Sequence, residues 1–422
     1  MHALFVSWLD GPSGHRSRTA SHRAASAGIR EFRASGFGLV SEFGFRASDF
    51  RFRPDIILAS PCACLTFCAM PKLAPPPLVA PETWPALLAA AAEFAALRPW
   101  DFMDDSQVVG LLDPGTGETR IGCVLGNAGQ VFAAVFYRRA GLRWILHMLD
   151  DTPDPEDLNT ADGIDCLKLE FMPKRELWPE DRAVLQAAAF KPAGRGSVWP
   201  QFRAAEPGWH PWHITQAEAG QFLADLPRFT AFCRLLQAQP ELFADRSPTE
   251  IPFLPATLPA RPLTPQDLDW HPLLPPSSNL DPFHPTAAEL QPVRALPRQA
   301  GLVCEFDCSL LPGASFVEAG RPCFGRLSLL VEHELGLVLG MGVQSGALTP
   351  GEAAGRGLLE SLRTGGRRPE RLLIRGERLR PVLQPLCDAL EIQLRPVPEL
   401  PALAEAATAL SRHMLAGGAG RF

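Results

Sequence analysis

The last third of the chain opens with three apolar, strand-like segments, GLVCEFDCSLL (301–311), GRLSLLVEHE (325–334) and LGLVLGMGVQ (335–344). After them, segments with helical spacing of apolar residues alternate with short apolar runs: EAAGRGLLESLRT (352–364), RLLIR (371–375), LRPVLQPLCDAL (379–390), IQLRPV (392–397) and ALAEAATALSRHML (402–415). Helices and strands differ in this spacing and in length. The pattern therefore predicts the order β-β-β-α-β-α-β-α over residues 301–416.

This order resembles that of the RNase H-like fold, which nucleases, integrases and transposases share. The resemblance implies a three-layer α/β domain. VCEFDCSL also resembles the opening of integrase cores, in which an Asp at the end of the first strand holds a divalent metal ion, and Asp307 matches that Asp. The resemblance therefore implies that Asp307 is a catalytic residue and a metal ligand.

Integrases place a second acid just after the fourth strand and a third on the final helix. Here Gly376 stands where the second acid is expected, with Glu377 beside it, and Glu405 is the candidate on the final helix. If Asp307, Glu377 and Glu405 converge, they offer the hard oxygen ligands that Mg²⁺ or Mn²⁺ prefers. The substituted second acid departs from the integrase pattern and favours a degenerate, inactive site. In that alternative the three carboxylates are solvated or cap turns.

Composition restricts the class of protein without revealing its activity. The chain has 422 residues, enough for two or three domains, and a formal net charge of -6. This charge provides no general basic field for non-specific binding of nucleic acid. No apolar run is long enough to cross a bilayer, and the ten cysteines follow no regular framework. These features predict a cytoplasmic protein with reduced thiols and no membrane partner.

Residues 1–69 differ from the rest of the chain. They are rich in Arg, contain no Lys and show no sustained periodicity. The apolar run DIILASPCACLTFCA (55–69) begins far beyond roughly the first 30 residues, where a signal peptide has its charges followed soon by its apolar run. We expect a disordered or mis-assigned extension, with translation starting at Met70.

Residues 70–245 read as an α+β domain. The predicted elements are a helix within 81–97 with Thr83 as N-cap, a hairpin over 108–126, a strand at 130–137, a short helix at 141–149, a strand at 164–173 and a helix at 179–190. Thr215 and Glu218 form a T-x-x-E capping box ahead of a long helix that ends near Phe243.

Both parts also resemble an uncharacterised bacterial two-domain family of unknown function. The first part does so through RPWDFMDD, DPGTGETRIGCVLGNAGQVFAAVFY and SVWPQFRAAEPGWHPWHIT, and the second through VCEFDCSLLP, RPCFGRLSLLVEHELGLVLG and RRPERLLIRGERL. Trp100 and the WHPWH segment (209–213) could form a binding platform. Aromatic residues in loops more often close a core, and we expect that here. His210 and His213 lack further metal ligands at a convincing spacing.

The segment 246–300 contains thirteen prolines. Proline donates no backbone hydrogen bond, so neither a long helix nor a central strand is expected. We interpret the segment as a linker or as a stretch that wraps a domain surface.

Two functions remain open from the sequence. The first is a non-catalytic binding or scaffold protein whose partner is an unidentified protein. The second is a metal-dependent nuclease or a related phosphodiester-cleaving enzyme, for which the cofactor would be Mg²⁺ or Mn²⁺. The net charge and the missing second acid favour the first.

Overall fold

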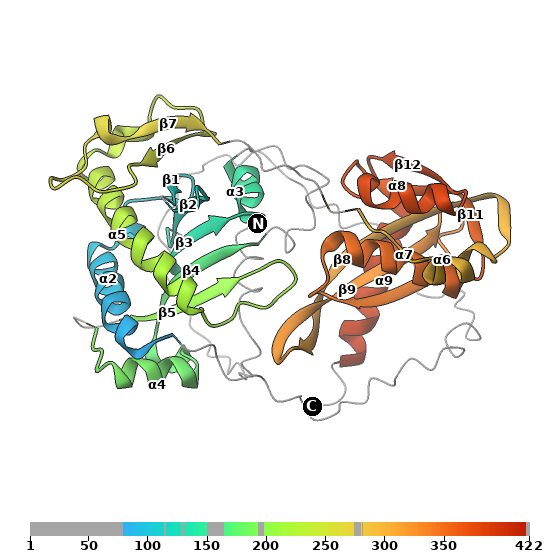
Figure 1. Ribbon diagram of the computed structural model, residues 1–422, viewed down its shortest axis with the longest axis horizontal. Coiled ribbons are helices and arrows are strands. Elements are labelled where there is room, and N and C mark those ends of the chain that lie inside the picture. The colour runs from blue at the N-terminus through green and yellow to red at the C-terminus, as the bar shows by residue number, and fades with distance from the viewer. Residues whose placement is uncertain are drawn as a thin grey trace, which may run out of the picture. The chain divides into compact units, whose positions relative to one another are not determined.

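The computed structural model describes residues 79–113, 115–127, 129, 131–149, 164–192, 198–273, 280 and 282–418. The expected extension 1–69 lies outside these residues. The described part contains eight α-helices and two mixed β-sheets (Figure 1), and both sheets belong to one compact unit. The fold is therefore mixed α/β.

The first sheet has seven strands in the order β5-β4-β3-β2-β1-β6-β7. Its strands are β1 (Val109–Leu112), β2 (Thr119–Leu125), β3 (Phe132–Arg138), β4 (Cys166–Met172), β5 (Trp199–Ala205), β6 (Glu250–Leu254) and β7 (Asp269–Pro272). All neighbours are antiparallel except β1 and β6, which are parallel. The predicted hairpin and the strands at 130–137 and 164–173 are thus confirmed.

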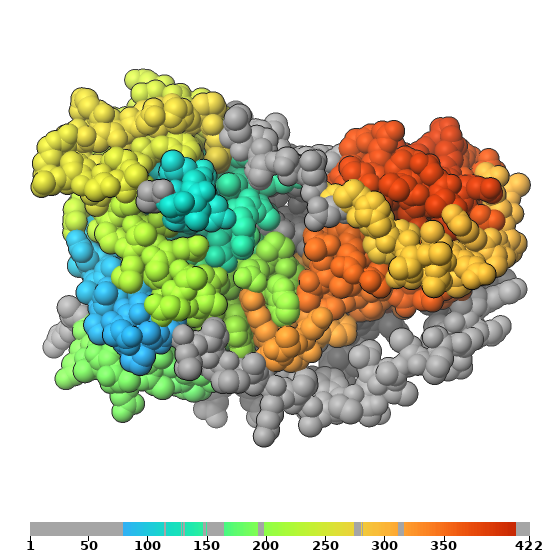
Figure 2. Space-filling view, in the orientation of Figure 1, coloured from blue at the N-terminus to red at the C-terminus, as the bar shows by residue number. Residues whose placement is uncertain are grey.

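Helices α2 (Trp84–Leu97) and α5 (Gln216–Ala238) pack together on one face of this sheet. They bury Phe94, Phe222 and Phe229 against Phe136 of β3. Figure 2 shows the atoms of α2 and α5 in contact along this face. The other face carries a second cluster beside α3 (Gly141–Leu149). Helix α4 (Pro179–Ala187) follows β4.

Two helix starts can be compared with their predictions. The capping box of α5 is confirmed, because the Thr215 hydroxyl accepts from the Glu218 N–H and the Glu218 carboxylate accepts from the Thr215 N–H. Thr83 occupies the N-cap position of α2, but its hydroxyl does not cap the helix. It accepts instead from the Gln216 amide at 3.1 Å, because the two helix starts lie together.

The proline-rich segment 246–300 contributes to both sheets. It supplies β6 and β7 to the first and α6 (Ala287–Arg294) to the helices beside the second. Strand β6 lies inside the sheet, contrary to the expectation of no central strand. Its parallel pairing with β1 involves only Phe253 and Leu254, so Pro252 has no partner strand on that side.

The second sheet has five strands in the order β10-β9-β8-β11-β12. They are β8 (Arg298–Glu318), β9 (Arg321–Glu332), β10 (Val338–Ser345), β11 (Arg368–Arg375) and β12 (Gln393–Val397). Strands β8, β9 and β10 are antiparallel neighbours, whereas β11 runs parallel to both β8 and β12. The predicted order of elements is confirmed, and residues 371–375 lie in β11 beside β8.

Helices cover both faces of this sheet, which gives three layers. On one face, α7 (Pro350–Gly365) and α8 (Arg380–Ala389) pack on Cys304, Phe306 and Leu372. On the other, α9 (Pro401–Gly418) packs over β9 and β8 through Leu403 and Ala406. Side chains alternate between the faces along each strand. Among the described helices, none combines the length and apolar character needed to cross a membrane.

Candidate functional site

Asp307 lies in the middle of β8, opposite Leu329 of β9. Leu329 belongs to the cluster under α9, so the Asp307 side chain is on the α9 face of the sheet. The carboxylate is half-buried, and its Oδ1 accepts from the backbone N–H of Cys308 at 2.8 Å. The structure therefore places Asp307 on a central strand, on the face of the sheet that α9 covers.

Glu377 and Glu405 lie in exposed positions. Glu377 follows β11 after Gly376, whose φ of 54° turns the chain, and it forms an exposed ion pair of 3.1 Å with Arg380. Glu405 is exposed on α9, while Leu403 and Ala406 of the same helix face the sheet. Successive helical residues are rotated by about 100°, so Glu405 points away from the surface that Leu403 buries.

The structure does not bring these three carboxylates into a ligand group. Across the described residues, no group of three or more His, Cys, Asp or Glu side chains is arranged to hold a metal ion. The catalytic roles of Asp307, Glu377 and Glu405 stay a prediction.

A different carboxylate on the same face is fully buried. Glu305, two residues before Asp307, has no exposed surface. Its Oε1 lies 2.6 Å from Nδ1 of His333, and its Oε2 accepts from the backbone N–H of Leu403 at 2.7 Å. Leu403 lies in the first turn of α9, where N–H groups have no partner within the helix and a negative charge is favourable. Glu305 thus ties α9 to β8 and to the turn after β9.

Sequence reasoning missed Glu305. The available signal was a Glu within an apolar strand, at the same parity as Asp307. A charge in the interior of a central strand needs partners, because an unpaired buried carboxylate is costly. The local sequence does not identify these partners, which are a helix start and a histidine distant along the chain.

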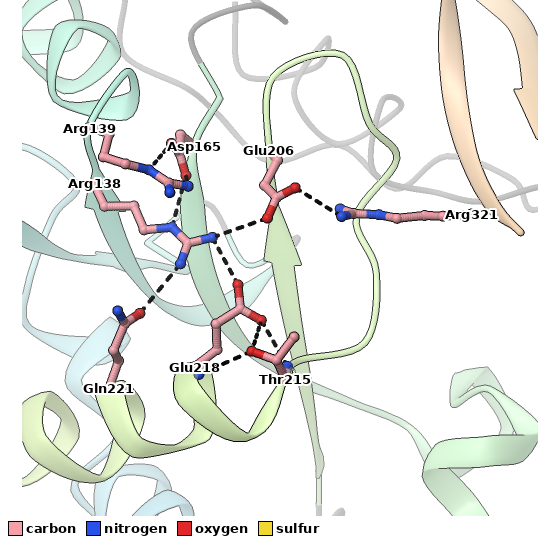
Figure 3. A network of polar contacts seen from close by, with 8 residues as sticks. All are labelled: Arg138, Arg139, Asp165, Glu206, Thr215, Glu218, Gln221 and Arg321. Atoms are coloured by element: carbon pink, nitrogen blue, oxygen red, sulfur yellow. Dashed lines mark hydrogen bonds and ion pairs between the residues drawn. The ribbon is translucent and has the colours of Figure 1, made fainter. Parts of the chain in front are cut away.

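The first sheet contains a buried ionic network at the end of β3, shown in Figure 3. The Arg138 guanidinium contacts Asp165 at 2.8 Å and Glu218 at 2.9 Å, and all three side chains are buried. Arg139 reaches the same Asp165 carboxylate at 2.7 Å. Strand β3 alternates between faces, so Arg138 points to the α5 side with Phe136. The first turn of α5, where Glu218 lies, is therefore fixed to the sheet.

A second buried pair lies two turns further along α5. Asp225 is seven residues after Glu218 and so on the same side of the helix. Its carboxylate binds Arg120 of β2, and neither side chain has exposed surface. Arg120 also reaches Asp113 at 3.1 Å. Backbone N–H groups of the β1–β2 turn, that of Thr116 first, lower the pKa of Asp113 to about 2. These contacts set the position of α5 over the sheet.

Residues 206–210 contact β9 of the second sheet. Glu206 pairs with Arg321 at 2.9 Å (Figure 3), and the Arg321 guanidinium lies over the ring of Trp209. Backbone bonds join the two segments, including one of 2.9 Å from the Phe324 N–H to the Gly208 carbonyl. Since Glu206 also lies 3.8 Å from Arg138, a chain of charges runs from the first sheet to the second.

The histidines and tryptophans of the WHPWH segment take packing roles. The His210 ring lies 3.9 Å from that of Phe324, and His213 lies beside Trp178 and Trp212. Burial lowers the pKa of both histidines below the usual 6.5. Trp100 is buried in the core under α2 and α5, which confirms that this residue closes a core, and Trp212 is buried beside Trp178.

Cysteines of the second sheet are buried free thiols. This holds for Cys304, Cys308 and Cys323. Burial, reinforced by the nearby Glu332 charge, raises the pKa of Cys304 to about 12. A thiol with such a pKa is protonated and a poor nucleophile at neutral pH.

Comparison with known proteins matches two stretches of the chain to families. Residues 84–253 match the family described as Domain of unknown function (DUF7309). Residues 289–411 match the one described as Domain of unknown function (DUF6930). No curated protein and no solved structure matches the chain. The first match ends within β6, and the second begins within α6 and spans the second sheet. The chain therefore pairs two domains of unknown function in one polypeptide.

Proposed function

We propose that the second domain has an RNase H-like fold and that the protein is a non-catalytic, cytoplasmic binding or scaffold protein. The fold proposal draws support from the order of elements and from β11, which lies parallel beside the central β8. The domain boundaries proposed are 70–245 and 301–416, joined by 246–300. A cytoplasmic location agrees with the buried free thiols among the described cysteines.

The observation that carries the non-catalytic proposal is the separation of the candidate carboxylates. Two-metal hydrolysis needs carboxylates that converge on ions about 3.5–4 Å apart. Asp307 is half-buried on β8, whereas Glu377 is held by Arg380 and Glu405 points to solvent. The fully buried Glu305 uses both oxygens in holding α9 and His333. Its carboxylate is thus committed to structure.

The second candidate function is a metal-dependent nuclease with Mg²⁺ or Mn²⁺ as cofactor. One observation favours it, namely the position of Asp307 on the central strand that the integrase resemblance implies. In this proposal, Asp307 holds the metal and Glu377 and Glu405 complete the site after rearrangement.

A cleavage assay separates the two functions. The full chain and the variant Asp307→Asn are incubated with labelled single- and double-stranded DNA and RNA, with Mg²⁺, with Mn²⁺ and with chelator. The non-catalytic proposal expects no metal-dependent product with either protein. Cleavage by the wild type that disappears in Asp307→Asn would establish the nuclease. Far-UV circular dichroism of both proteins checks that the substitution leaves the fold intact.

A further inference from the structure

Three arginines share one face of β11 and β12, at the edge of the second sheet. Leu373 of β11 is aligned with Glu305 on one side and with Arg395 on the other, so all three point to the α9 face. Arg371 and Arg375 lie two residues either side of Leu373 and share that face. We call Arg371, Arg375 and Arg395 the arginine surface.

The spacing of the arginine surface follows from sheet geometry. Adjacent strands lie about 4.8 Å apart and each residue advances about 3.3 Å, so the Cα of Arg395 is about 8 Å from those of Arg371 and Arg375. Figure 1 shows β11 and β12 side by side, with β12 outermost. Arg395 is exposed, and the other two are half-buried. The three charges therefore lie close together on two directly paired strands.

The guanidinium groups of this surface have no partner among the residues that the structure describes. In the region that the structure describes, no hydrogen bond or ion pair involves the side chain of Arg371, Arg375 or Arg395. Neighbouring arginines differ: Arg368 donates to the Leu390 carbonyl at 2.7 Å, and Arg380 pairs with Glu377. Three close like charges repel one another, so an anionic partner would stabilise them.

The rest of the face indicates what kind of anion fits. Besides the arginines it presents Leu373, Gln393 and Val397, and neither β11 nor β12 contains an aromatic residue. Sites for single-stranded nucleic acid combine basic side chains with aromatic rings on which bases stack. Guanidinium forks next to aliphatic and amide side chains suit carboxylates on a peptide.

We propose that the arginine surface binds an acidic segment of a partner protein. This rests on the proposed binding function and names the partner chemistry. Carboxylates of the segment pair with the three guanidinium groups, beside Leu373 and Val397, which are half-buried against the cluster under α9. Such pairing should weaken as salt rises, because exposed charges are screened.

Fluorescence anisotropy with a labelled decaglutamate peptide tests the proposal at about 50 mM salt. The full chain is compared with Arg371→Ser/Arg395→Ser. The control Arg175→Ser/Arg182→Ser removes the same charge at and before α4 of the first sheet. Wild type and control should bind alike, and the Arg371→Ser/Arg395→Ser variant about tenfold more weakly. Single- and double-stranded oligonucleotides are measured in parallel.

Three results would overturn the proposal: no peptide binding by the wild type, equal loss in both variants, or tighter arginine-dependent binding of an oligonucleotide than of the peptide. The last would identify nucleic acid as the partner. None of these depends on metal-dependent cleavage, so failure of this surface and failure of the non-catalytic function are distinguishable.

Discussion

Replacing Glu305 by Ala tests the contact that holds α9 on the second sheet. The fully buried carboxylate makes two short bonds, one to His333 and one to the backbone N–H of Leu403. Glu305→Ala removes both, leaves the Leu403 N–H without an acceptor and opens a small cavity. Glu305→Gln keeps an acceptor for Leu403 but loses the charge. Glu405, an exposed acid on α9, gives the control variant Glu405→Ala.

The magnitude follows from opposing contributions. Two hydrogen bonds to a charged group contribute about 3–6 kcal/mol, and the cavity adds about 1–2 kcal/mol. Removing the carboxylate also removes the cost of keeping a charge away from water, and this offsets several kcal/mol of the loss. We expect Glu305→Ala to lower the free energy of unfolding by about 2–4 kcal/mol and Glu305→Gln by about 1 kcal/mol. Glu405→Ala should change it by less than about 0.5 kcal/mol.

The tryptophan positions make the assay selective. The last of the nine tryptophans is Trp270, so none lies in residues 301–416 and their fluorescence reports mainly on the rest of the chain, whereas far-UV circular dichroism reports on both sheets. In urea, Glu305→Ala should move the circular dichroism transition to lower denaturant and leave most of the fluorescence transition in place. Amide exchange at Leu403 should accelerate. An unchanged dichroism transition would refute the structural role of Glu305.

Three further substitutions probe the first domain and its contact with β9. Gly208 has a φ of 78°, and a Cβ there would lie 1.8 Å from the Gly346 carbonyl oxygen, so Gly208→Ala should cost about 2 kcal/mol or more in thermal unfolding. Asp225→Ala leaves buried Arg120 without its partner, so we expect it to lower the free energy of unfolding by about 3 kcal/mol, measured by urea titration. Burial lowers the pKa of His210 below 6.5, so the unfolded chain takes up a proton that the folded chain does not, and stability falls as pH drops below 6.5. When the pH is lowered from about 7.5 to about 5.5, the melting temperature of His210→Gln should fall less than that of the wild type.

The secondary structure of the second domain was predictable because each element has a clear period. Apolar residues alternate with a period of two in β8 and recur with helical spacing in α7, so pattern and fold agree. Strand β5 was not predicted, because its residues WPQFRAA combine Pro, Gln and Arg within a short run. Gln201 and Arg203 are both buried there and held by Asp181 of α4, a long-range contact that no local pattern reveals.

The candidate site was less predictable than the fold. The position of Asp307 on the central strand follows from the order of elements. Whether Glu405 faces the sheet depends on the rotation of α9, which Leu403 and Ala406 determine by burying their own side chains. The buried pairs of Arg138 with Glu218 and Arg120 with Asp225 join residues about one hundred positions apart, so only the folded chain brings them together.

Manganese binding tests the central claim most directly, because it does not require knowledge of a substrate. The full chain and Asp307→Asn are titrated with Mn²⁺, and free and bound ion are measured by electron paramagnetic resonance. The non-catalytic account predicts the same weak, non-saturating uptake by both proteins. A stoichiometric site in the wild type that is lost in Asp307→Asn would contradict it and assign the second domain a metal centre.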